Sequence, residues 1–183
     1  VGSEMCIRDR HYAISEGKVR DYRKLLQELE LFHAMGAGNF HELMLAVAKD
    51  PAMLAFLDAG VNVKGAPNEN FAREIMELFT VGVGNYDEQD IREAARAFTG
   101  WNYVDLQFVF NEHEHDGARK VFLGRSGEFD GEDIIAMIME QPATAEYIAG
   151  KIYRFFVRTE LSTELQSELG SVLRAADYEL SLI

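Results

Sequence analysis

Apolar residues recur at helical spacing in the first part of the chain. After Ser15 the apolar positions follow one another at steps of mainly three or four residues: Val19, Tyr22, Leu25, Leu26, Leu29 and Phe32. Such spacing is typical of one face of an α-helix. Gly36 and Gly38 come directly after this pattern, and glycine commonly ends a helix. The pattern therefore predicts one helix that begins after Ser15 and ends near Gly36.

Polar capping residues predict where the next two helices begin. Asn39 precedes an apolar run, and Glu42 follows it three residues later, which is the pattern of a capping box. Asp50-Pro51 predicts the start of a third helix, because proline is well tolerated at the first helical position. We expect this third helix to end by Gly60.

Residues 68–101 form the most regular stretch, and they predict two helices joined by a glycine loop. At about 100° per residue, the first helix has an apolar side made of Phe71, Ile75, Leu78 and Phe79. Its other side is polar and consists of Glu69, Asn70, Arg73, Glu74 and Glu77. Gly82 and Gly84 suit a sharp connection. Asp87, with Asp90 in the first turn, predicts the cap of the second helix.

Two short β-prone runs interrupt the helical pattern at 107–110 and 119–123. Asp116-Gly117 lies between them and is a turn signal. We expect the two runs to pair as one small hairpin. Helical patterns return over 132–140 and 142–157, and a last one follows Ser162 or Thr163.

The composition is typical of a globular chain, and the net charge argues against some classes of binding partner. The 183 residues are 48% hydrophobic and 27% charged, with a formal net charge of −13. Such an acidic surface repels phosphate backbones and anionic lipids, so we expect no nucleic-acid partner. No apolar run approaches the roughly 20 residues that span a bilayer. Together the patterns predict a mainly α, multi-helix, bundle-like domain with one small β-hairpin.

The two ends of the chain do not continue these patterns. Residues 1–10 resemble translated sequencing-adaptor sequence, and residues 180–183 resemble the start of the opposite adaptor reading. We therefore expect non-native tails at 1–10 and 180–183, and a single helical domain over 11–179. Cys6 is the one cysteine in the chain. Without it the domain offers no disulfide and no thiolate metal site.

The charged face of the first helix in 68–101 has two interpretations. Glu69, Arg73 and Glu77 follow one another at steps of four residues and can form a ladder of ion pairs. Alternatively, Glu74 and Glu77 face a cleft as metal ligands or as an acid–base pair, which requires a low-dielectric pocket. The sequence leaves both interpretations open and favours the ion pairs.

Basic and aromatic residues further along the chain are expected to serve the structure. Arg92 and Arg96 are the natural partners of these glutamates if the two helices form a hairpin. We expect Trp101 to anchor the core or a domain interface. Lys120 and Lys151 are expected to be surface or ion-pairing residues.

A second candidate site is His113-Glu114-His115-Asp116. Imidazole and carboxylate together suit a divalent metal ion such as zinc. On a strand, His113 and His115 would point to the same side. No third ligand follows at a recognisable spacing, and the turn alone explains Asp116-Gly117. Metal binding by His113, His115 and Asp116 is thus a hypothesis beside a purely structural turn.

Four blocks of sequence resemble a bacterial family, the "domain of unknown function 1800" proteins. The blocks are HAMGAGNFHELMLAVAKDPAMLAFLD at 33–58, NENFAREIMELFTVGVGNYDEQDIREAARAFTGW at 68–101, HDGARKVFLG at 115–124 and PATAEYIAGKIYRFFV at 142–157. Several candidate residues fall on motif positions of this family: His33, Glu69, Asn70, Arg73, Glu74, Glu77, His115 and Asp116. Asp87 departs from the family's usual Thr or Ser cap and caps equally well.

The resemblance implies a mainly α fold in a longer protein, of which this chain would be an interior fragment. Many members of the family look exported. Their genes often neighbour those of another uncharacterised family, number 1501, which is a possible partner. The family has no activity that could be carried over to this chain.

Two functions therefore stand side by side. The first is a structural or interaction module of an exported bacterial protein, in which the polar motif is an internal brace. The second is a metal-assisted, hydrolase-like enzyme in which four side chains converge around a divalent metal ion: Glu74, Glu77, His115 and Asp116.

Overall fold

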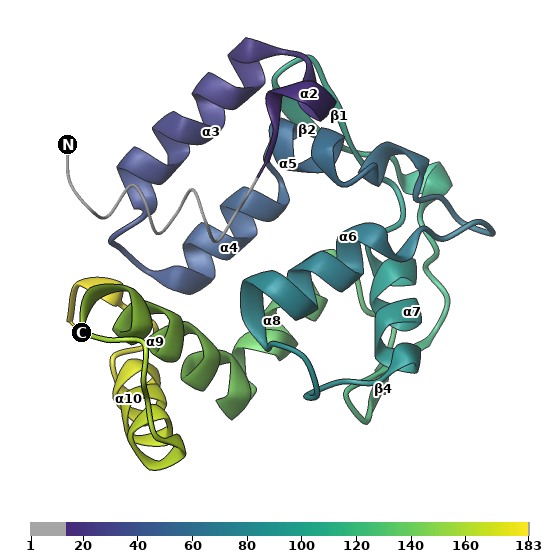
Figure 1. Cartoon of the computed structure of the whole chain (residues 1–183). Helices are drawn as coiled ribbons and strands as arrows, with labels where there is room; N and C mark the ends of the chain where they lie inside the picture. Colours follow the sequence, from purple (N-terminus) through teal and green to yellow (C-terminus); the bar gives the residue numbers. More distant parts are fainter. Residues whose placement is uncertain (1–13, 183) are drawn as a thin grey trace.

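The computed structural model describes residues 14–182, which form a mainly α fold with two small β-hairpins. Figure 1 shows the helices arranged around α8, with α10 lying beside α9 at one end of the molecule. The α-helices are α2 (Glu16–Val19), α3 (Tyr22–Met35), α4 (Phe40–Ala48), α5 (Pro51–Phe56), α6 (Glu69–Glu74), α7 (Glu88–Ala97), α8 (Gly131–Met139), α9 (Pro142–Phe156) and α10 (Thr163–Ala175). The π-helix η2 (Ile75–Thr80) continues α6, and short 3₁₀ turns are η1 (Ala59–Val61), η3 (Glu112–Glu114) and η4 (Leu180–Leu182).

Local capping chemistry places most helix starts where the sequence predicts them. Asn39, Asp50 and Ser162 each accept a hydrogen bond from a backbone N–H in the first turn of the helix that follows. Asp87 and Asp90 form a reciprocal capping box at the start of α7. Each cap satisfies donors that a helix start otherwise leaves without a partner.

The single helix predicted after Ser15 is wrong, because the chain breaks into α2 and α3. Arg20 adopts a left-handed conformation with φ 53°, which ends α2. Asp21 is extended, and its side chain accepts a hydrogen bond from Arg23 N at the start of α3. The apolar spacing continues across the break and therefore hides it.

The prediction that Leu78 shares the apolar side of its helix is wrong, because the helix widens there into η2. In a π-helix each N–H bonds to the carbonyl five residues back, so each turn holds more residues than in an α-helix. Buried positions accordingly repeat every four residues: Phe71, Ala72, Ile75, Met76, Phe79 and Thr80. Leu78 falls outside this repeat and is 45% exposed.

The strands pair differently from the prediction of one hairpin between 107–110 and 119–123. β1 (Trp101–Val104) pairs antiparallel with β2 (Gln107–Phe110), and β3 (Lys120–Phe122) pairs with β4 (Arg125–Gly127). Each hairpin closes through a two-residue loop, a connection that requires positive φ. Asp105 supplies it in the β1–β2 loop with φ 55°, and Leu123 and Gly124 supply it in the β3–β4 loop with φ 46° and 75°. These local loops form two hairpins in place of one long one.

The core is built mainly from the inner faces of α4 to α9, with one aromatic group at its centre. Trp101 is 3% exposed, so the predicted core role is confirmed. Its ring lies edge-on to Phe98, with ring centroids 5.1 Å apart, and to Phe108, at 5.2 Å. Phe71 completes the group, with its ring centroid 6.4 Å from that of Trp101. Offset and edge-on pairs of this kind are the preferred arrangement of aromatic rings.

The predicted tails lie at the margins of the described chain. Residues 1–10, including Cys6, lie outside the described residues. Residues 180–182 form η4, and Leu180 N donates a hydrogen bond to Gly38 O. In the part of the chain that the structure describes, no helix is both long and apolar enough to cross a membrane.

Candidate functional site

Arg73 links α6 to α7 through two carboxylates. Its Nη2 lies 3.0 Å from Glu69 Oε2, which is one half of the predicted ladder of ion pairs; Arg73 makes its second ion pair with Glu88 and not with Glu77. The same guanidinium makes a bidentate contact with Glu88, at 3.0 and 2.8 Å. The Arg73 hydrogen bond lowers the pKa of Glu88. Arg73 is 35% exposed and Glu88 65% exposed, so water screens this linkage.

The predicted pairing of Arg92 and Arg96 with the glutamates of α6 is wrong. Arg92 Nη2 contacts Gln89 Oε1 within α7, at 3.0 Å. Arg96 reaches Glu93 in its own helix and Asp116 in the following loop. The ion pair that joins the two helices is instead made by Glu88, the first residue of α7, with Arg73 of α6. The helix orientation that decides this cannot be obtained from residue types alone.

Glu74 and Glu77 occupy a half-buried surface beside the loop after η2. Burial and the neighbouring charge of Glu77 raise the pKa of Glu74. Glu77 Oε2 lies 3.4 Å from the Tyr86 hydroxyl, which donates to it. Asn70, on the same helix, donates from Nδ2 to Leu57 O at 3.1 Å and ties α6 to the end of α5.

The end of η2 is held by two side chains of α9 that sequence reasoning did not place there. Tyr147 Oη and Lys151 Nζ each donate a hydrogen bond to Leu78 O, both at 3.1 Å. Gly82 has φ 73°, and a Cβ there would lie 2.6 Å from the Tyr147 ring. Burial lowers the pKa of Lys151 to about 8. Carbonyls in the last turn of a helix have no partner within the helix and commonly take such donors.

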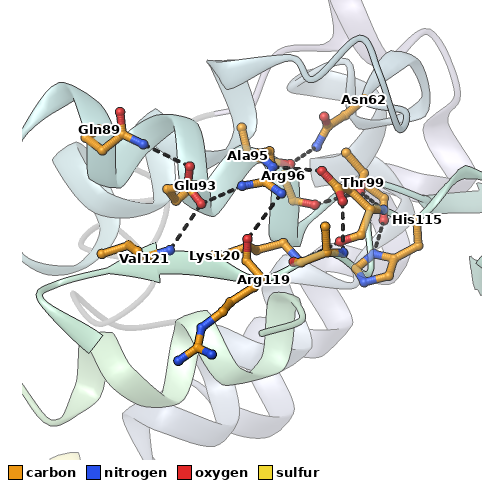
Figure 2. Close-up of polar contacts among 12 residues, drawn as sticks. Asn62, Gln89, Glu93, Ala95, Arg96, Thr99, His115, Arg119, Lys120 and Val121 are labelled. Carbon is orange, nitrogen blue, oxygen red and sulfur yellow. Dashed lines mark hydrogen bonds and ion pairs between the residues drawn. The ribbon is translucent and has the colours of Figure 1, made fainter. Parts of the chain in front are cut away.

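A more buried polar network surrounds Arg96, and Figure 2 shows Arg96 beside Glu93. Arg96 Nη1 lies 2.7 Å from Glu93 Oε2, and its Nε lies 2.7 Å from Asp116 Oδ2. The side chains of Arg96, Glu93 and Asp116 are 25%, 10% and 15% exposed. The Arg96 hydrogen bond lowers the pKa of Asp116. We call Glu93, Arg96 and Asp116 the Arg96 network.

Acidic side chains of α7 also hold the strand β3. Val121 N donates to Glu93 Oε2 at 3.2 Å, and Leu123 N donates to Asp90 Oδ1 at 2.8 Å. Lys120, the first residue of β3, is 1% exposed, and its ammonium group donates to backbone carbonyls. The prediction that Lys120 is a surface or ion-pairing residue is therefore wrong. Burial lowers its pKa.

His115 and Asp116 attach their loop to the end of α7. His115 Nδ1 lies 2.9 Å from Thr99 O, and Asp116 N donates to Thr99 Oγ1 at 2.7 Å. Thr99 is fully buried. Gly100 permits this approach, because a Cβ there would lie 2.5 Å from Asn111 O. The four residues close the loop onto the helix.

His113 does not lie beside His115 as predicted for a strand. Residues Glu112–Glu114 form η3, a 3₁₀ turn, and successive residues of such a turn project in different directions. His113 is exposed, whereas His115 is half-buried. Across residues 14–182 no group of three or more His, Cys, Asp or Glu side chains could hold a metal ion. The geometry does not bring the glutamates of α6 and η2 together with His115 and Asp116 as a ligand set.

Comparison with known proteins adds a family and no activity. Neither the curated proteins nor the solved structures contain a match to this chain. A family model described as "Protein of unknown function (DUF1800)" matches residues 9–183. This match covers nearly the whole chain and includes each residue of the Arg96 network. The chain therefore belongs to the family of proteins of unknown function DUF1800.

Proposed function

We propose that this domain is a non-catalytic interaction module in which the polar residues of the family motif hold the fold together. One observation carries the proposal: the candidate catalytic group Asp116 forms an ion pair with Arg96, inside a network that also fixes Glu93. A carboxylic acid that donates a proton near neutral pH needs a raised pKa. The pKa of Asp116 is instead lowered by its arginine partner.

The contacts of His115 support the same function. Its Nδ1 is occupied by a backbone carbonyl 2.9 Å away, and its ring lies against Phe110 with centroids 5.2 Å apart. Arg73 likewise directs its guanidinium to two carboxylates, those of Glu69 in its own helix and of Glu88 in α7. The hydrogen-bonding groups of His115 and Arg73 thus connect neighbouring segments of the fold.

Export and the identity of the partner are further parts of the proposal. The resemblance to the family supports an exported bacterial protein and a partner from the neighbouring family 1501. The net charge of −13 supports a protein partner over a nucleic acid. Mixing the purified chain with a purified family 1501 protein tests the pairing by calorimetry. Heat of binding at a defined stoichiometry is expected, and no binding at any salt concentration contradicts this partner.

Elemental analysis separates the module from the enzyme hypothesis. We expect the purified protein to carry no stoichiometric transition metal, because the possible ligands are spread through the fold and engaged with other groups. A stoichiometric metal that disappears in a His115→Ala variant would contradict the proposal and support metal-assisted catalysis. An Arg92→Ala variant is the control, since Arg92 lies on the exposed side of α7.

A further inference from the structure

Helix α3 packs Phe32 into the core, yet it also leaves three large apolar side chains exposed and buries two charged ones. Tyr22, Leu26 and Leu29 are 77%, 52% and 37% exposed. Lys24 and Glu28, on the other side of the same helix, are only 8% and 3% exposed. The apolar stripe of a helix ordinarily faces the core. A contiguous apolar stripe left in water is typical of a surface that binds another protein.

The exposed stripe has the same spacing when it is read in either direction. It consists of Tyr22, Leu26, Leu29 and His33, separated by steps of four, three and four residues. At about 100° per residue these side chains fall within an arc of about 60°. An antiparallel copy of the helix therefore places Leu26 opposite Leu29 and Tyr22 opposite His33. We call these four residues the α3 stripe.

The charges beside the α3 stripe favour the same antiparallel arrangement. Arg23, which also pairs with Asp21 and Asp105 of its own chain, and Glu30 are exposed and lie on one flank of the stripe, within about 20° of each other around the helix. Two helices related by a two-fold axis perpendicular to both bring equal flanks together. Arg23 of one copy then lies within about 3 Å, along the helix axis, of Glu30 of the other, given a rise of about 1.5 Å per residue. A parallel pair would separate these two charges.

We propose that the α3 stripe binds the α3 stripe of a second copy of this chain in an antiparallel, two-fold symmetric pair. The contact is isologous, which is the commonest form of symmetric association. Four side chains cover less than the roughly 800 Å² per partner of a stable interface. The association is therefore weak, and the charge of −13 on each copy opposes it at low salt.

Sedimentation equilibrium of the chain alone tests the pair, under reducing conditions that exclude a disulfide through Cys6. We expect a reversible monomer–dimer equilibrium that strengthens from low to moderate salt, because screening reduces the repulsion of like charges. Leu26→Glu is expected to raise the dissociation constant by about tenfold or more. Val172→Glu is the matched control, because Val172 is 52% exposed on α10 and the charge change is identical.

Three outcomes would overturn the pair. One is a monomer at every concentration and salt; another is an equal response of the Leu26 and Val172 variants. The third is an unchanged dissociation constant for Glu30→Lys, which places two cations together on the flank. Circular dichroism verifies that each variant is folded. The sedimentation experiment uses this chain alone. Its result for the pair of α3 helices is therefore independent of whether the chain binds a family 1501 protein.

Discussion

Replacing Arg96 by alanine separates a buried brace from a surface ion pair. Arg96 and Arg73 both lie in helices, and both contact two carboxylates. They differ in burial: the partners of Arg96 are 10% and 15% exposed, whereas those of Arg73 are 37% and 65% exposed. Arg96→Ala therefore leaves two largely buried carboxylates without their cation, and Arg73→Ala leaves two that water can solvate.

The expected magnitudes follow from this difference. Removing one partner of a buried pair costs about 3–5 kcal/mol, and the residual exposure of Arg96 reduces this to about 2–4 kcal/mol. Exposed pairs contribute about 0.2–1 kcal/mol, which is the loss expected for Arg73→Ala. For a domain of this size about 1 kcal/mol changes the Tm by about 2–4 °C. We expect the Tm to fall by about 5–12 °C for Arg96→Ala and by less than about 4 °C for Arg73→Ala.

Urea unfolding followed by circular dichroism measures both free energies of unfolding, with thermal scans beside them. Alanine and arginine have similar helix propensities, so the comparison reports on the ion pairs. Adding Asp116→Ala to Arg96→Ala completes a double-mutant cycle, in which a coupling energy of about 1–3 kcal/mol is expected. An Arg96→Ala loss below about 1 kcal/mol, or a loss equal to that of Arg73→Ala, would refute the reasoning.

Three further predictions concern backbone conformation and pH. Gly82→Ala is expected to destabilise by about 2–4 kcal/mol, because it adds a clash with the Tyr147 ring to the cost of a positive φ. Gly84→Ala, at an open position with φ 94°, should cost about 1–2 kcal/mol, and equal losses in urea unfolding would contradict this. Burial raises the pKa of Asp50 from 3.8 to about 6, so its contribution to stability is full below pH 3.8 and is lost as the pH rises through about 6. Asp50→Asn keeps the helix cap without a buried charge and should stabilise more above pH 6 than below it; the same gain on both sides would disprove the shift. Arg96 lowers the pKa of Asp116 below 3.8. The stabilisation of the folded state by the Asp116 carboxylate is therefore present above pH 3.8 and is lost as the pH falls through the lowered pKa. In acid titrations of unfolding free energy, Asp116→Asn should flatten this loss.

Helix starts could be predicted from the sequence because each depends on a few neighbouring residues. Asn39, Asp50 and Asp87 cap their helices through backbone groups two or three residues away. The break at Arg20 could not be predicted, because an arginine with positive φ has no mark in the apolar pattern. The π-helix could not be predicted for a related reason. A test for 3.6-residue periodicity assumes α-helical geometry, and the helix around Leu78 is a π-helix.

The candidate site was predictable only where its contacts are local. The Glu69–Arg73 pair follows from a separation of four residues. Arg96 and Asp116 are separated by 20 residues, and the path of the intervening hairpin decides that they meet. Lys120 is a further example, because its sequence context shows a charge next to a β-prone run and its burial depends on the packing of α7. Residue types identified Arg73, Arg96 and Asp116 but not Glu88 or Glu93, and the tertiary fold decided the pairs.

The geometry of α7 gives the acidic residues of this helix a structural role. A two-stranded hairpin is marginally stable by itself, and β3 has one neighbouring strand, β4. Successive outward N–H groups of a strand edge lie two residues apart, as do those of Val121 and Leu123. Asp90 and Glu93 are three residues apart on one face of α7, so their carboxylates reach both N–H groups in the place of a third strand. Two neighbouring carboxylates repel each other unless a cation lies beside them. Arg96 is that cation: it lies 2.7 Å from Glu93 and also binds Asp116, in the loop before the strand. The helix thus completes the edge of the hairpin, and the charges of Asp90, Glu93 and Arg96 serve this attachment.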